Sequence, residues 1–241
     1  MAKSDTAAGS RAKSDTAAAS RAKSAEAPLR AVDGRVPGRR GLATRKRLVE
    51  CTIDLLASTS YRDLKVTDIT RAAGTSPATF YQYFVDLETV LLAVAEHAVE
   101  EGQQLVDLIA GQPWGGAAGV TSAEALVDGF LDFYRTHRPT LKVVDLLSTE
   151  GDRRFRHLRV LILNGMTKAL AEEIRRVQGD PDVDAGHVDP MAMAGALIGL
   201  LPQMAGHQGG FEAWDIPFAH VREAMIRLIY WGVSGPKVPK R

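Results

Sequence analysis

The stretch AAGTSPATFYQYF, residues 72–84, decides the fold because it joins two short helices through a tight turn. The first helix is predicted over 66–73, and Gly74 ends it in the left-handed conformation that glycine adopts readily. Ser76 is expected to cap the next helix, and Pro77 suits its first position. We predict a helix of about one turn, too short to bury much of a face, so something outside the protein is expected to touch it.

This order of a helix, a short helix, a glycine-containing turn and a second short helix is that of a helix-turn-helix. In this motif the second short helix enters the major groove of DNA, and its first residues meet the base edges. Phe80 and Phe84 lie four residues apart, so they share a face and anchor the helix on the core. The alternative is an ordinary helical hairpin whose tyrosines stay half-buried.

The residue types of the second short helix suit DNA. Ala78 and the methyl group of Thr79 fit a thymine methyl, and the Thr79 hydroxyl can bond a base or a phosphate. Tyr81 and Tyr83 lie on the flanks, where phenols reach phosphate oxygens. The unpaired N–H groups at the helix start also favour a phosphate.

The DNA-binding domain of the TetR family of transcriptional regulators resembles residues 44–92, TRKRLVECTIDLLASTSYRDLKVTDITRAAGTSPATFYQYFVDLETVLL. Within them, the stretch GTSPATFYQYF is similar in sequence to actinobacterial members of the family. The resemblance rests on Ile69, the Ala73–Gly74 pair, Ser76, the FYQYF run and Glu88. It implies a homodimeric repressor that binds a palindromic operator in double-stranded DNA and is released by a small ligand. The candidate DNA contacts are Arg45, Lys46, Arg47, Lys65, Thr67, Thr75, Ser76, Pro77, Ala78, Thr79, Tyr81 and Tyr83.

Three positions depart from the family pattern. Ala78 stands where many members have glycine. Lys65 replaces the usual Ser or Thr cap, and although its side chain cannot cap a helix, it can reach a phosphate. Leu87 replaces a common lysine, and the basic residues at the front of the first helix would compensate for that lost contact.

Charge is distributed unevenly along the 241 residues. Residues 1–47 hold twelve Lys and Arg residues against four acidic ones, although the whole chain has a net charge of only +1. The first 30 residues repeat with a period of ten and have no large apolar residue before Leu29, so they cannot bury enough surface to order themselves. We predict a flexible basic arm over 1–41 that contacts a polyanion. A tail without a role is the alternative.

The rest of the chain is predicted to be all-α, since no run of alternating β-forming residues occurs. The expected domains are a DNA-binding domain over 42–88, a ligand-binding and dimerisation domain over 89–234 and a flexible tail over 235–241. The expected helices are 44–58, 66–73, one from Pro77, 86–108, 122–136, 139–149, 152–178, 189–206 and 217–232.

The helix over 189–206 is apolar all round, so it must be covered on two sides. Small residues such as Ala192, Ala194, Gly195, Ala196 and Gly199 permit close approach of a neighbour. We expect Leu197 and Leu200 in a dimer interface, together with the stripe Phe218, Val221, Met225, Leu228 and Ile229 on the last helix. A single monomeric core is the alternative.

Aromatic and methionine residues define a candidate pocket for a small apolar ligand, although plain core packing is the more common role of such residues. Asn164 is predicted to lie inside the apolar stripe of the helix 152–178, where its amide would need a partner. The candidate ligand contacts are Trp114, Phe130, Phe133, Tyr134, His137, Asn164 and Met166.

Other functional classes find little support. The single Cys51 excludes an internal disulfide and is expected in the core. No catalytic residues, cofactor or metal site are predicted: the acidic loop DPDVDAG at 180–186 fails the EF-hand pattern, and His97 with Glu101 offers too few ligands. The chain has no signal peptide and no apolar run of about 20 residues, so a cytoplasmic protein without membrane contact is expected. An architectural DNA-binding protein that uses the basic arm nonspecifically is the second functional hypothesis.

Deleting residues 1–41 tests the arm. The deletion removes nine Lys and Arg residues and four acidic ones. Affinity is expected to fall for all DNA sequences alike, and the slope of log affinity against log salt should become shallower because fewer phosphates are neutralised. A slope identical to that of the intact chain would show that the arm touches no phosphate.

Overall fold

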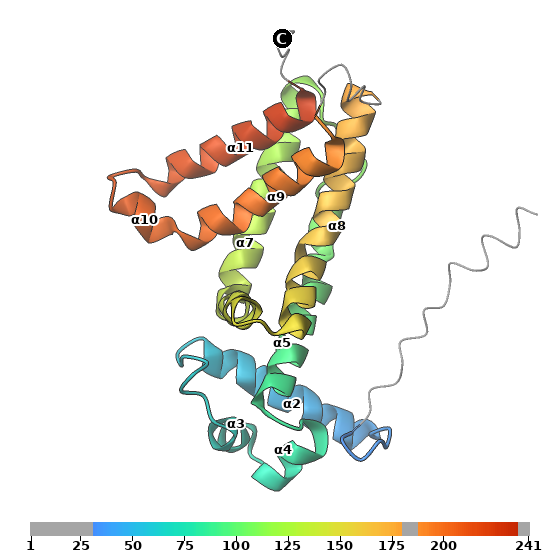
Figure 1. The fold of residues 1–241 in the computed structure, drawn as a ribbon, viewed down its shortest axis with the longest axis vertical. Helices are drawn as coiled ribbons and strands as arrows, with labels where there is room; N and C mark the ends of the chain where they lie inside the picture. Colours follow the sequence, from blue (N-terminus) through green and yellow to red (C-terminus); the bar gives the residue numbers. More distant parts are fainter. Residues whose placement is uncertain (1–30, 180–187, 236–241) are drawn as a thin grey trace, which may run out of the picture.

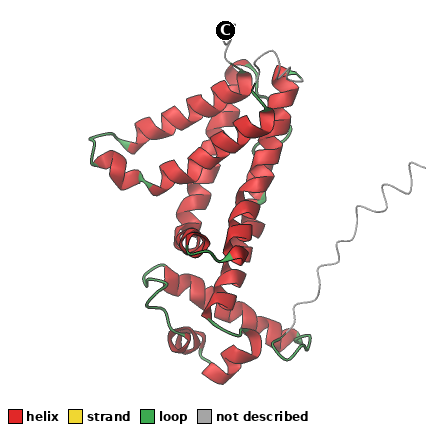
Figure 2. Cartoon of the chain, viewed as in Figure 1, coloured by secondary structure: helices red, strands yellow, loops and turns green. Residues whose placement is uncertain are grey.

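The computed structural model describes residues 31–179 and 188–235, and these are helical with no strand (Figures 1 and 2). The predicted all-α class is confirmed. The N-terminal helices are α2 (Arg39–Leu56), α3 (Val66–Ala73), α4 (Pro77–Tyr83) and α5 (Leu87–Gly102). The C-terminal helices are α6 (Gln104–Asp107), α7 (Gly116–Thr149), α8 (Arg153–Gln178), α9 (Pro190–Gly206), α10 (Gln208–Glu212) and α11 (Phe218–Ser234).

The helices α2, α3 and α4 form a head at one end of the molecule, and α5 leads from it into the C-terminal helices (Figure 1). Apolar side chains of the head, including Leu48, Ile69 and Phe80, are fully buried. Their cluster continues into Val144 of α7 and Phe155 of α8. The head therefore shares a core with the C-terminal part, and the orientation of one constrains the other.

The long helices α7 and α8 form the body of the C-terminal part, and the pair α9 and α11 packs across them (Figure 1). Arg222 fixes the beginning of α11 to α7: its Nε donates to Asp128 at 2.6 Å and its Nη2 to Glu124 at 2.7 Å. The hydrogen bond from Arg222 lowers the pKa of the Asp128 carboxyl.

Two predicted helix boundaries are wrong. The segments 122–136 and 139–149 are one helix, α7, with Pro139 inside it. Proline removes one backbone hydrogen bond, but Tyr134, Leu141 and Val144 are buried on both sides of it, and this packing keeps the helix continuous. Conversely, the segment 86–108 divides into α5 and α6 after the buried Gly102.

Residues 1–30 of the predicted arm and 236–241 of the predicted tail lie outside the described residues, as does the acidic loop 180–186. Residues 32–34 form a turn, and α2 begins at Arg39, five residues before the predicted start at 44, so residues 39–41 of the predicted arm are helical. Within the described ranges, no helix is long and apolar enough to cross a membrane.

The apolar helix α9 has one buried face and one exposed face. Leu197 belongs to the buried face: it is only 8% exposed and packs against Gly232 of α11, where a Cβ would lie 2.5 Å from a Leu197 methyl carbon. The expectation that Leu197 lies in an intersubunit interface is therefore wrong. The stripe on α11 also turns inward, with Val221, Met225 and Ile229 buried.

Most of the small residues of α9 lie on its exposed face, whereas Ala194 is fully buried. Ala192, Gly195 and Ala196 are exposed, and a Cβ added at Gly195 or Gly199 would meet nothing within 4 Å. On α11, Leu228 is 43% and Trp231 is 52% exposed. Helix α9 has an apolar sequence on all sides because its exposed face also carries small apolar residues.

Replacing Leu197 with alanine should destabilise the protomer by about 2–5 kcal/mol, the usual cost of emptying a buried leucine site. Leu200→Ala is the matched control on the half-buried neighbouring position, where the loss should be smaller. Urea unfolding followed by circular dichroism measures both values. Equal small losses for the two variants would contradict the assignment of Leu197 to the protomer core.

Candidate functional site

The turn between α3 and α4 has the predicted geometry. Gly74 has a φ of +65°, and the N–H groups of Gly74 and Thr75 bond the last carbonyls of α3. Ser76 caps α4, since its Oγ accepts the N–H of Thr79 at 3.2 Å, and Pro77 occupies the first helical position. The predicted caps are thus confirmed, although α4 has seven residues, more than the single turn expected.

The anchoring of α4 follows the aromatic pattern. Phe80 is fully buried and Phe84 nearly so, and their rings lie 5.4 Å apart. Their burial turns the opposite face of α4 outward, so that Ser76, Pro77 and Ala78 are exposed. Three of the predicted DNA contacts therefore form one accessible surface at the end of the head.

The two hydroxyl groups of this surface interact with each other. The Oγ1 of Thr79 lies 3.0 Å from the Oγ of Ser76, and Thr79 is half-buried. Either hydroxyl can be the donor in this contact, so a DNA group that bonds one of them would compete with the other. The tyrosines differ: Tyr81 is 51% exposed, whereas Tyr83 is half-buried beside Gly41 of α2.

The remaining candidate contacts surround α4. Thr67 is exposed on α3, Thr75 is half-buried in the turn, and Lys65 occupies the cap position of α3 without a capping bond from its side chain. In Figure 1, α3 and α4 both lie at the end of the molecule that is farthest from α9 and α11. This placement leaves the end of the head accessible to a long duplex.

The three basic residues at the front of α2 are not equivalent. Arg45 is half-buried, with its guanidinium carbon 5.1 Å from the centre of the Phe84 ring, an arrangement that stabilises the cation. The Lys46 ammonium lies 3.6 Å from Glu50 on the surface. Arg47 is exposed. Arg47 is therefore the one of the three with the most freedom to reach a phosphate.

The candidate ligand residues separate into two groups. Trp114, Phe130 and Met166 are packed in the C-terminal core, and the indole N–H of Trp114 donates to the Ile109 carbonyl at 3.1 Å. Phe133 and His137 instead line a cavity of about 390 Å³ at the junction of α5, α6 and α7. The full lining is Glu101, Gln104, Leu105, Leu108, Gly129, Asp132, Phe133, Thr136 and His137.

Asn164 does not lie inside the apolar stripe of α8, so that prediction is wrong. The buried stripe is formed by Phe155, Leu158, Ile162 and Met166, whereas Asn164 is half-buried and about half a turn away from Ile162. Tyr134 is buried in the core with its ring stacked on that of Phe130, and burial raises the pKa of its phenol.

A carboxylate holds two histidines at the edge of this cavity. Glu101 lies 2.9 Å from His137 Nε2 and 3.0 Å from His97 Nε2, while the His137 ring packs 4.6 Å from that of Phe133. The His97–Glu101 pair was visible in the sequence as neighbours on one helix face. His137 is 36 residues away, so no local pattern could place it there. In the described part of the chain, no three His, Cys, Asp or Glu side chains are arranged so that they could hold a metal ion.

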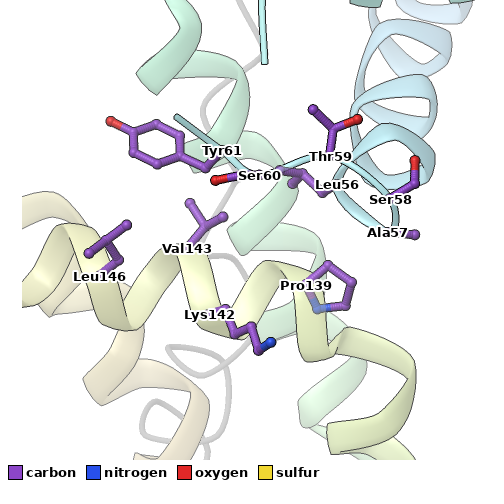
Figure 3. A pocket seen from close by; sticks show the side chains of 10 residues that line it. All are labelled: Leu56, Ala57, Ser58, Thr59, Ser60, Tyr61, Pro139, Lys142, Val143 and Leu146. Carbon is purple, nitrogen blue, oxygen red and sulfur yellow. The ribbon is translucent and has the colours of Figure 1, made fainter. Parts of the chain in front are cut away.

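A second cavity, of about 360 Å³, lies between the loop after α2 and the C-terminal part of α7 (Figure 3). Pro139, Val143 and Leu146 project toward the loop residues 57–61. Beside it, Arg62 donates to Glu150 at 2.9 Å, and burial, together with the charges of nearby carboxylates, raises the pKa of the Tyr61 phenol. No sequence pattern predicted this cavity, because its walls come from segments about 80 residues apart.

An exposed, capped second helix on a three-helix head, joined to a larger helical domain with cavities, defines a helix-turn-helix regulator. Family comparisons agree. Residues 48–94 match the model of bacterial regulatory proteins of the tetR family, and residues 105–240 match that of the tetracyclin repressor-like C-terminal domain. The second match alone covers more than half of the chain, and the chain belongs to the TetR family of transcriptional regulators.

Solved structures share the fold. A TetR-family regulator from Streptomyces coelicolor is 18% identical, with 80% of this chain and 82% of that chain covered and a TM-score of 0.60. The fatty acid degradation regulator FadR from Bacillus halodurans is 17% identical, with 86% and 100% covered and a TM-score of 0.56. FadR from Bacillus subtilis, in complex with stearoyl-CoA, is 14% identical, with 78% and 98% covered and a TM-score of 0.55. No curated protein sequence matches the chain.

Thr79 and Tyr81 should have different roles on DNA. Thr79→Val keeps the shape but removes the hydroxyl, and binding should weaken by about 1–3 kcal/mol on operators with the preferred base if that hydroxyl bonds a base edge. Tyr81→Phe removes a phosphate hydrogen bond, so specific and random DNA should weaken by similar amounts, about 1 kcal/mol.

Affinities for a panel of single-base operator variants measure both effects. Both substitutions leave Phe80 and Phe84 in place, so unchanged melting curves serve as the folding control. Wild-type affinity of Thr79→Val for every operator would contradict the base contact. A changed base preference in Tyr81→Phe would reverse the two roles.

Proposed function

We propose that the chain is a repressor that binds a palindromic operator as a homodimer and is released by a small apolar ligand. The observation that carries this proposal is the outer face of α4, where Ser76, Pro77 and Ala78 are exposed and fixed by the burial of Phe80 and Phe84. Such a face suits base edges in a major groove. The protein would act in the cytoplasm, where its DNA is.

The exposed face of α9 and α11 supports a dimer. A two-fold interface uses the same surface of both subunits, and the open positions Gly195 and Gly199 allow two α9 helices to approach closely. Leu228 and Trp231 would supply apolar area beside them. Two heads related by this symmetry suit an operator with two inverted half-sites.

The cavity beside Phe133 supports an apolar ligand. Its apolar wall comes from Leu105, Leu108 and Phe133, and its polar edge contains Glu101 and Asp132. No lysine or arginine is among its lining residues. Although one structural neighbour binds stearoyl-CoA, this lining suits a neutral apolar molecule better than a polyanionic thioester.

Selection from a pool of randomised duplexes tests the proposal against the architectural alternative. A repressor should enrich one inverted repeat and bind it at least about 10³-fold more tightly than random DNA. Equal affinity for enriched and random duplexes, with a steep salt dependence, would instead favour nonspecific architectural binding.

The dimer proposal predicts that Leu228→Glu and Trp231→Glu give monomers, because each would bury a carboxylate in an apolar interface. Operator affinity should fall sharply, since two half-sites are no longer held together. Val160→Glu, on an exposed position of α8, is the matched control and should change neither property. Light scattering measures the mass. A wild-type monomer at micromolar concentration would contradict the proposal.

A further inference from the structure

The turn that precedes α2 is attached to α4. Within it, the Ala31 N–H donates to the Arg35 carbonyl at 2.8 Å, and the Gly34 N–H donates to the Ala31 carbonyl at 2.9 Å. The Asp33 carboxylate accepts the N–H of Arg35 at 3.0 Å. These bonds close residues 31–35 into a compact turn with its own internal structure.

A backbone hydrogen bond joins this turn to α4. The Val32 N–H donates to the Gln82 carbonyl at 2.9 Å. Gln82 belongs to the last turn of α4, where carbonyls have no partner within the helix. The bond therefore satisfies an exposed acceptor and fixes the turn against the C-terminal end of α4.

Close packing at Gly41 reinforces the attachment. A Cβ at Gly41 would lie 2.9 Å from the Pro37 Cβ and 3.1 Å from the phenol oxygen of Tyr83. Only a glycine allows Pro37, α2 and Tyr83 to approach this closely. The segment 31–41 is thus packed against α4 both at Val32 and at Gly41.

The charge of this segment is positive and accessible. It holds Arg35, Arg39 and Arg40 against the single acid Asp33. The Arg35 side chain is 86% exposed, and its contact with Asp33 is a surface pair at 3.5 Å, which contributes little and is easily exchanged. Arg39 and Arg40 are exposed and have no ion-pair partner in the described part of the chain.

We propose that the docked segment 31–41 is a second DNA-binding element, in which Arg35, Arg39 and Arg40 contact the phosphates that flank each half-site. This inference rests on the proposed function, in which the first residues of α4 meet the bases. A seven-residue helix is about 10 Å long, equal to about three base-pair steps of 3.4 Å. An element fixed to the far end of α4 therefore lies over the backbone next to the bases that α4 reads.

The ligand class follows from the chemistry. Guanidinium groups match the oxygens of phosphates, and phosphate contacts carry no sequence information. The segment should therefore lengthen the footprint and add affinity without adding base preference.

The test compares the full chain with Arg35→Ala/Arg39→Ala/Arg40→Ala on the operator enriched from randomised duplexes. Each lost phosphate contact should make the slope of log affinity against log salt shallower by about 0.9. The hydroxyl-radical footprint should retreat by about three base pairs at its outer edges. The matched control, Arg135→Ala/Lys168→Ala/Arg175→Ala, removes three charges from α7 and α8 and should change neither.

A second variant tests the docking itself. Gly41→Val keeps every charge but pushes Pro37 and Tyr83 apart, so the outer footprint should be lost while circular dichroism still reports a folded chain. An unchanged footprint would overturn the role of the docked turn.

The outcomes separate this inference from the proposed function. A triple variant identical to its control on an operator that the wild type binds would overturn the inference alone. A loss confined to operators with A·T-rich flanks would overturn the phosphate assignment in favour of minor-groove binding. A wild-type chain that enriches no sequence would overturn the proposed function and the inference with it.

Discussion

The burial of Phe80 and Phe84 is the contact on which the DNA-binding surface depends. These rings fix a helix of only seven residues, which could not be stable alone. With one face held in the head, the other must be exposed, and that face carries Ser76, Pro77 and Ala78. The core thus holds α4 rigidly through Phe80 and Phe84, while its remaining face stays accessible because so short a helix buries only one face.

The same core couples the head to the rest of the molecule. Apolar residues of the head pack in one cluster with residues of α7 and α8, and the cavity in Figure 3 lies on the boundary. A change in the packing of α7 would therefore reach the head through direct contacts. The cavity beside Phe133 is also lined by α7, and it lies close to the C-terminal end of α5. A ligand bound there would therefore contact two helices that also pack against the head.

Local chemistry made the head predictable from sequence. Gly74 and Ser76 act through neighbours one to four residues away, and both have the expected roles. Asp86 caps α5 through an equally local bond to Thr89. The C-terminal part was less predictable, because tertiary packing decides it. Because of this packing, α7 stays helical at Pro139 and Leu197 is buried against Gly232. It also places Glu101 within hydrogen-bond distance of His137. No pattern within one helix contains such information, and the cavities arise only once distant segments meet.

The placement of α4 in a major groove is the central claim, and directed cleavage tests it most directly. Iron–EDTA attached to a cysteine at position 78, in a chain whose Cys51 is replaced by serine, cuts DNA only near that position. We expect cleavage centred within each half-site, and none above background from the same reagent at position 160 on the exposed surface of α8. Equal cleavage from both positions, or none from position 78 on a bound operator, would contradict the account.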